Sequence, residues 1–154
     1  NKIKNVNHLG NTLIELYCEN NCGINQNGIM NLKILRILNA NNNKYINNVN
    51  HLANTLIKLD CSFDCGINQD GIKDLKILQN INVCYNKKIN NVNHLANTLI
   101  KLNCSYNCEI NQHGIKDLRI LQKLKAYGNQ QINNVNHLAN TLIELDCGND
   151  CGID

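Results

Sequence analysis

The sequence predicts an α/β solenoid, a curved array with a parallel sheet on its concave side and short 3-10 or helical turns on its convex side. Three observations predict this fold. The pentapeptide Asn-Val-Asn-His-Leu begins at residues 5, 48, 91 and 134, a constant step of 43 residues. A shorter apolar spacing divides each step into two coils, and apolar and polar residues alternate over part of each coil. A fixed period of this size is typical of solenoids, propellers and other arrays.

Each coil begins at a leucine, and the steps between these leucines alternate between 22 and 21 residues. Within a coil the pattern is L-x-x-L-x-L-x-x-N-x-x-I, and Leu56, Leu59, Cys61 and Asp64 occupy its first four marked positions. The pattern predicts a single solenoid domain over residues 1–154. Its seven strand frames begin at Leu13, Leu35, Leu56, Leu78, Leu99, Leu121 and Leu142.

These frames resemble the leucine-rich repeat superfamily, whose signature is L-x-x-L-x-L-x-x-N/C-x-L. Residues 24–29 are similar to a stretch of the cysteine-containing subclass, whereas the short period is similar to the internalin-like subclass, and the choice between them stays open. The sequence disfavours a WD40 propeller because it contains no Trp. It disfavours HEAT or armadillo helices because its Asn-rich segments are poor helix formers.

Each frame predicts one short strand, in which successive side chains point to opposite faces. Leu59 and Cys61 are therefore expected in the core and Asp60 on the sheet face. The return segments, such as residues 71–75 and 91–95, have room for only a turn or two of helix. The resemblance implies that the ninth residue of each frame stacks beneath the turn after the strand and bonds its backbone. These residues are Asn21, Asn43, Asp64, Asn86, Asn107, Asn129 and Asp150.

Composition limits the classes of partner. The chain is 43% hydrophobic and 18% charged, which is enough apolar material to fold. Its net charge of +3 is too small to argue for nucleic acid on its own, so a nucleic-acid partner is not expected, and no apolar run reaches the roughly 18–20 residues of a membrane span. The sequence begins inside a return segment and ends at Asp154, just after a strand frame. We interpret it as part of a longer array without caps, whose end coils are expected to fray or self-associate.

Cysteine and histidine recur with the repeat, which favours structural roles for both. The cysteines form four C-x-x-x-C pairs plus Cys84, and the first of each pair replaces a core leucine and is expected to behave as a small buried hydrophobe. An extended segment would hold the two cysteines of a pair too far apart for a disulfide or a shared zinc ion. Reduced thiols favour a cytoplasmic location. No catalytic constellation is present, so we expect no enzyme activity, cofactor or metal site. The recurring histidines are His8, His51, His94 and His137.

Binding is expected where the sheet face departs from the repeat. Lysines gather in the middle of the array, with acidic residues on either side, and three consecutive coils carry an aromatic residue just before the ninth position. Aromatic residues on a rigid sheet are favoured at protein interfaces, although aromatic side chains also stack simply because adjacent strands suit them. The sequence predicts a non-catalytic module that binds a protein partner. One alternative is polyanion or nucleic-acid binding by the same lysines and tyrosines, and another is a structural or self-associating spacer. The candidate residues are Lys58, Phe63, Asn82, Tyr85, Lys101, Asn103, Tyr106, Lys123, Lys125 and Tyr127.

Overall fold

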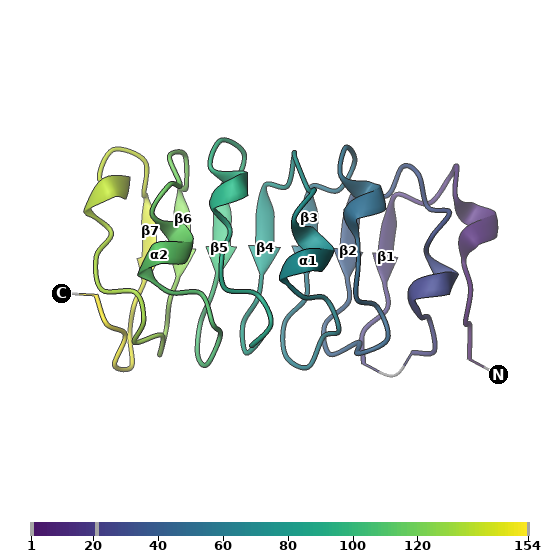
Figure 1. The fold of residues 1–154 in the computed structure, drawn as a ribbon, viewed down its shortest axis with the longest axis horizontal. Helices are drawn as coiled ribbons and strands as arrows, with labels where there is room; N and C mark the ends of the chain where they lie inside the picture. The colour runs from purple at the N-terminus through teal and green to yellow at the C-terminus, as the bar shows by residue number, and fades with distance from the viewer. Residues whose placement is uncertain (1, 21, 154) are drawn as a thin grey trace.

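A computed structural model describes residues 2–20 and 22–153. Seven strands of three residues each form one parallel sheet, and their order in the sheet is their order in the chain (Figure 1). Leu16 pairs with Leu38, Leu38 with Leu59, and so on through every coil, so equivalent frame positions lie side by side. The strands are β1 (Glu15–Tyr17), β2 (Ile37–Asn39), β3 (Lys58–Asp60), β4 (Asn80–Asn82), β5 (Lys101–Asn103), β6 (Lys123–Lys125) and β7 (Glu144–Asp146).

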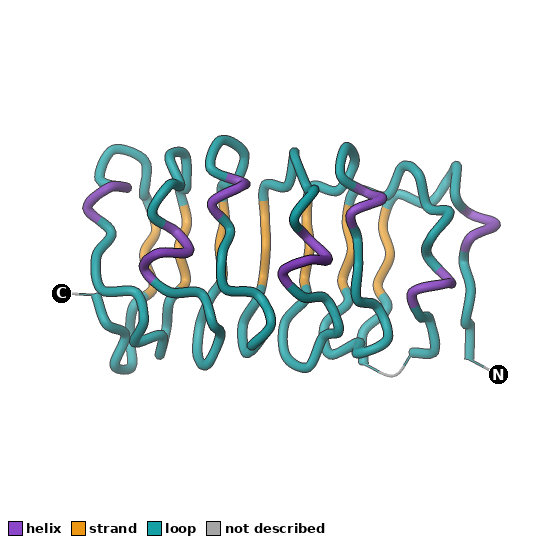
Figure 2. The backbone as a smooth tube through the Cα atoms, in the orientation of Figure 1, coloured by secondary structure: helices purple, strands orange, loops and turns teal. Residues whose placement is uncertain are grey.

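The return segments form a second layer, which lies over one face of the sheet (Figure 2). They contain only short helical turns, as the sequence predicts, and the N- and C-terminal ends lie at opposite ends of the array (Figure 1). In the longer return segments an Asn side chain begins the turn: the Asn68 Oδ1 accepts a hydrogen bond from the Gly71 N–H at 2.9 Å. The turns are η1 (Asn7–Leu9), η2 (Gln26–Gly28), η3 (Asn50–Leu52), α1 (Gln69–Ile72), η4 (Asn93–Leu95), α2 (Gln112–Ile115) and η5 (Asn136–Leu138).

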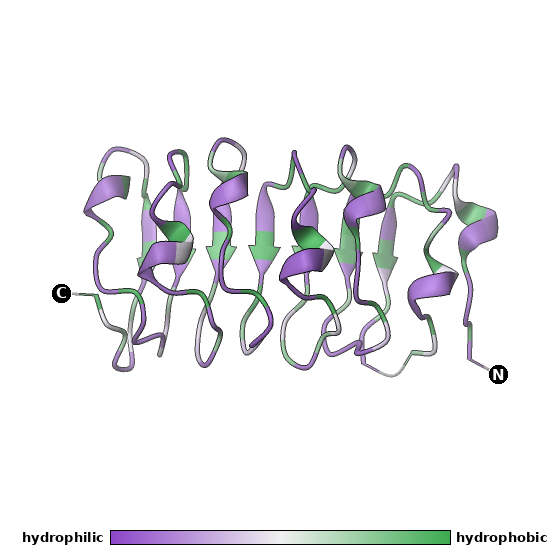
Figure 3. Ribbon diagram, in the orientation of Figure 1, coloured by the Kyte–Doolittle hydropathy of each residue, from purple (hydrophilic) through white to green (hydrophobic). Residues whose placement is uncertain are grey.

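The hydrophobic core lies between these two layers. Each strand carries both hydrophilic and hydrophobic residues, because its middle residue points inward and its neighbours point outward (Figure 3). At the edge strand β7 the inward-pointing Leu145 is 39% exposed, whereas Leu59 and Leu102 of interior strands are buried. The leucines that begin the interior frames are fully buried: Leu35, Leu56, Leu78, Leu99 and Leu121.

The polar ladder beneath the turns differs from the expectation. Asn86 is buried, and its Nδ2 donates to the carbonyl oxygens of Cys61 at 2.7 Å and Ile67 at 3.2 Å. In the neighbouring coils the ninth residues, Asp64 and Asn107, are exposed. The expectation of an Asn or Asp at every rung is therefore wrong for these coils and for the exposed Asp150, and Asn21 lies outside the described residues. The buried Asn rungs are Asn43, Asn86 and Asn129.

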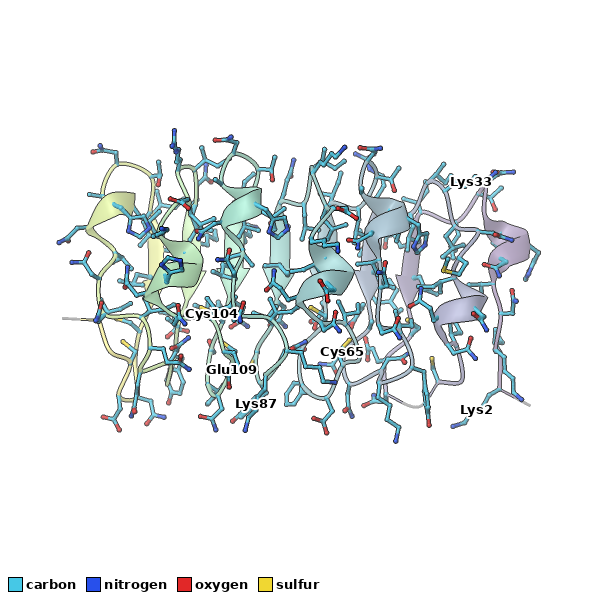
Figure 4. All side chains as sticks on the ribbon, in the orientation of Figure 1. Lys2, Lys33, Cys65, Lys87, Cys104 and Glu109 are labelled. Carbon is cyan, nitrogen blue, oxygen red and sulfur yellow. The ribbon has the colours of Figure 1, made fainter. Side chains whose placement is uncertain are left out.

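Cysteine occupies the alternate rungs. Cys65 and Cys108 follow the exposed ninth residues by one position, and both are buried (Figure 4 labels Cys65). The turn in these coils is thus one residue longer, and its tenth residue points inward. The Asn129 Nδ2 lies 3.5 Å from the Cys108 Sγ, so neighbouring rungs are in contact. In chain order the rungs are Cys22, Asn43, Cys65, Asn86, Cys108, Asn129 and Cys151.

This longer turn also brings the two cysteines of a pair together. The Cys108 Sγ donates to the Cys104 carbonyl oxygen at 2.9 Å, and hydrogen bonding between the two thiols raises the pKa of Cys104. The expectation that the pairs stay far apart is wrong, because the chain curls back after the strand instead of remaining extended. Burial raises the pKa of Cys18 to about 12, so that thiol stays neutral in the core. All nine cysteines are free thiols.

Candidate recognition surface

An aromatic row follows the C-terminal ends of four consecutive strands. The rings of Phe63 and Tyr85 stack with centroids 5.3 Å apart, and those of Tyr85 and Tyr106 stack at 4.6 Å. Tyr127 continues the row, with its ring tilted by 60° against Tyr106 at 5.3 Å. Phe63, Tyr85 and Tyr106 are 47%, 37% and 38% exposed. We call these four residues the aromatic row.

Three residues of the row have a backbone conformation that their side chains disfavour. The φ angles of Phe63, Tyr85 and Tyr106 are 59°, 57° and 60°, in the left-handed region that bulky residues rarely adopt. Such a conformation costs roughly 1–2 kcal/mol per residue unless the residue is Gly, Asn or Asp. The equivalent positions of the other coils hold residues that tolerate it: Asn20, Asn42, Gly128 and Asn149.

Tyr127 reaches the row from one position earlier in its coil. Gly128 occupies the left-handed position there, with φ of 66°, and carries no side chain to continue the stack. The Tyr127 ring lies over Gly148 of the next coil, where a Cβ would come within 3.1 Å of the ring carbon Cε2. The local sequence thus keeps space for the fourth ring.

A hollow of about 410 Å³ lies on the sheet face over β3 to β7. It contains four lysines, two carboxylates and three asparagines. All nine residues are the first or third residue of their strand. We call this site the lysine hollow. Its polar and charged lining residues are Lys58, Asp60, Asn80, Asn82, Lys101, Asn103, Lys123, Lys125 and Glu144.

Both carboxylates of the lysine hollow already have partners. Asp60 accepts hydrogen bonds from the Ser62 backbone N–H at 3.1 Å and from the Asn82 Nδ2 at 2.8 Å. Glu144 forms an ion pair with Lys123 on the adjacent strand, and the hydrogen bond from that ammonium lowers the pKa of the Glu144 carboxyl group.

The structure places the ten predicted residues in two adjoining groups. The lysine hollow contains the four lysines with Asn82 and Asn103, and the aromatic row contains the other four. The row therefore lies along the edge where the strands end, rather than over the strands themselves. Sequence reasoning missed Asp60, Asn80 and Glu144 as lining residues. They occupy the same positions of the repeat frame as the predicted residues, so the frame could have identified them.

Three of the recurring histidines connect their coil to the preceding one. The ring Nε2 of His51 lies 3.1 Å from the Ile29 carbonyl oxygen of the preceding coil, and His94 and His137 repeat this contact with Ile72 and Ile115. Within residues 2–20 and 22–153, no group of three His, Cys, Asp or Glu residues could hold a metal ion. The same residues include no helix of sufficient length and hydrophobicity to cross a membrane.

The short parallel strands, the buried leucine spine and the Asn and Cys rungs define a leucine-rich-repeat solenoid fold. A solved structure supports this assignment. The crystal structure of internalin C2 from Listeria monocytogenes is similar, with a TM-score of 0.57 and 21% sequence identity over 91% of this chain and 73% of that chain. A comparison with protein-family models finds no match, and a comparison with curated protein sequences finds no significant match.

Proposed function

We propose that this chain is a non-catalytic recognition module, which binds a protein partner through the lysine hollow and the aromatic row. The leucine-rich-repeat fold supports the proposal because it presents a rigid, open sheet face. Fold alone does not establish function, so the argument rests on the residues that depart from the repeat.

One observation carries the proposal: bulky aromatic residues occupy left-handed backbone positions where other coils hold Asn or Gly. Strain of this kind persists at functional sites, where another gain offsets it. Exposed, ordered aromatic side chains are the residues that most often dominate binding energy at protein interfaces. Phe63, Tyr85 and Tyr106 are exposed and therefore accessible for such contacts.

The test uses Asn as the replacement, because the coils at either end tolerate it at the same position. In Tyr85→Asn/Tyr106→Asn, relief of backbone strain of about 1–2 kcal/mol per residue offsets lost stacking of about 0.5–1.5 kcal/mol per ring pair. The variant should therefore remain folded by circular dichroism. Tyr45→Asn is the matched control, since Tyr45 is an exposed tyrosine outside the row.

A displayed library of random peptides is selected on the wild-type chain, and the selected peptides are then measured on each variant by biolayer interferometry. We expect the double variant to lose most of the binding and Tyr45→Asn to keep it. Peptides that bind the double variant as tightly as the wild type would refute a role for the row. Sedimentation of the chain alone tests the spacer alternative, for which mass should rise with concentration.

We also propose a cytosolic setting, which the nine free thiols support. Alkylation at the moment of lysis, followed by mass spectrometry of the chain from its native source, measures the thiol state. Nine alkylated cysteines are expected, and recovery of the chain with disulfides would contradict this setting.

A further inference from the structure

The lysine hollow contains more cations than carboxylates, with four lysines against Asp60 and Glu144. Lys123 is paired with Glu144, whereas Lys58, Lys101 and Lys125 make no hydrogen bond or ion pair within the described residues. Lys58 and Lys125 stand three strands apart across the sheet and two residues apart along the strands, which places their backbones about 16 Å apart at the usual spacings. A ligand that satisfies all three ammonium groups must therefore be extended and must carry several negative charges.

The distribution of charge along the array follows the same pattern. Lys58 and Lys101 occupy the same position of the 43-residue unit, and the two outer copies of the unit have Glu15 and Glu144 there. The surrounding sequence is nearly identical in all four copies. The repeat itself therefore does not require lysine at this position. Positive charge is confined to the middle of the sheet face, where the hollow lies.

The neutral side chains of the hollow favour a peptide over a nucleic acid. The Asn80 side chain and the Asn103 Nδ2 have no hydrogen-bond partner within the described residues. An amide group offers one donor and one acceptor side, which match the C=O and N–H groups of a peptide backbone.

We propose that the lysine hollow binds an acidic peptide segment of a partner protein, which lies across β3 to β6 with its carboxylates at Lys58, Lys101 and Lys125. This inference rests on the proposed function and names the class of partner. In an extended peptide, alternate side chains share one side and repeat every ~6.8 Å. Carboxylates four residues apart are thus about 14 Å apart, close to the separation of about 16 Å between the Lys58 and Lys125 backbones, and the long lysine side chains can span the difference.

The direct test uses a short fluorescent peptide in which Glu alternates with Thr, and an otherwise identical peptide in which Gln replaces Glu. Fluorescence anisotropy measures their affinity for the wild-type chain and for Lys58→Gln/Lys101→Gln/Lys125→Gln. Because each exposed ion pair contributes modestly, removing all three is expected to weaken binding of the Glu peptide by about 3-fold to 100-fold. Binding should also weaken as salt rises from about 50 to 300 mM.

A charge-matched control separates this site from a general effect of net charge. Lys33→Gln/Lys76→Gln/Lys116→Gln removes the same charge from exposed lysines outside the hollow, and it should bind the Glu peptide as the wild type does. Circular dichroism checks that both triple variants remain folded. Equal losses in the two triple variants, or equal affinity for the Gln and Glu peptides, would overturn the inference.

Two further outcomes distinguish the hypotheses. An oligothymidine of equal charge that binds more tightly than the Glu peptide, and loses binding in the hollow variant, would overturn the inference in favour of nucleic acid. Library peptides that depend on Tyr85 and Tyr106 but show no enrichment in Asp or Glu would also overturn it, while leaving the proposed function intact. The Glu peptide could instead depend on the lysines while its binding is unchanged by Tyr85→Asn/Tyr106→Asn. That outcome would support the inference and contradict the role of the aromatic row.

Discussion

The alternating ladder predicts that two asparagines at the same frame position differ sharply in their contribution to stability. Asn86 is the ninth residue of its coil and is buried, whereas Asn107 is the ninth residue of the next coil and is exposed. The perturbation is replacement of each by Ala. A ladder with an equivalent rung in every coil would predict similar losses, and the observed structure predicts very different ones.

The magnitude follows from the hydrogen bonds of Asn86. Its Nδ2 donates to the Cys61 and Ile67 carbonyl oxygens, and its Oδ1 accepts from the Lys88 N–H at 2.8 Å. Leaving a buried polar group unsatisfied costs about 1–3 kcal/mol, so losing all three bonds should lower the free energy of unfolding by about 3–5 kcal/mol. For a chain of this size that corresponds to a fall in Tm of about 6–20 °C.

Thermal and urea unfolding followed by far-UV circular dichroism measure both variants. Asn107→Ala should stay within about 0.5 kcal/mol of the wild type, because the Asn107 side chain is exposed and makes no hydrogen bond to the part of the chain that the structure describes. Asn86→Asp should be at least as destabilising as Asn86→Ala, since a carboxylate cannot donate to the two carbonyl oxygens. A loss below about 1 kcal/mol for Asn86→Ala, or equal losses at the two positions, would refute the reasoning.

Three further predictions concern the return segments, the histidines and the thiols. Gly71→Ala should lower the free energy of unfolding by about 1–3 kcal/mol in urea titrations, because the new Cβ would overlap the Asn47 carbonyl oxygen, and wild-type stability would contradict the close packing. Partial burial lowers the pKa of His51 and His94 below the ordinary 6.5, so the free energy of unfolding should be highest above pH 6.5 and fall as the pH drops below it. The variant His51→Gln/His94→Gln should flatten this dependence between about pH 5 and 8. An unchanged slope would exclude the histidines as its source. Iodoacetamide should modify the partly exposed Cys22, Cys147 and Cys151 before the buried Cys61 and Cys104 in peptide mapping by mass spectrometry, and early labelling of Cys61 would contradict the core.

The strand register follows from the sequence because burial fixes it. Moving Leu59 by one position would exchange every inward and outward side chain of its strand, so the leucine frames determine the pairing of Leu38, Leu59 and Ile81. The rungs beneath the turns do not follow from the same frames. Apolar spacing cannot show whether the ninth or the tenth residue points inward when a turn gains one residue. The signal was nevertheless present, since Cys65 and Asn86 stand 21 residues apart, as two rungs of one ladder should.

The charges of the lysine hollow are predictable only in part. The register places Lys123 opposite Glu144 and Lys125 opposite Asp146, so it indicates two possible ion pairs, of which only the first forms within the described residues. The bonds of Asp60 to Ser62 and Asn82 depend instead on side-chain rotamers, and Lys58 has no hydrogen-bond or ion-pair partner among residues 2–20 and 22–153. Local hydrogen bonding therefore decides which lysines remain available to a ligand. Residue types along the repeat do not reveal those bonds.

The aromatic row separates the requirements of the scaffold from those of recognition. Asn20 and Phe63 occupy the same position in successive copies of the 43-residue unit, with φ of 54° and 59°, so the backbone accepts either residue. Asn satisfies this conformation without the strain of about 1–2 kcal/mol that Phe incurs, and stacking with Tyr85 returns only about 0.5–1.5 kcal/mol. Stability alone thus gives the aromatic residue little advantage over Asn. The exposed aromatic surface that Phe63 adds favours recognition as the reason for its presence in the middle coils.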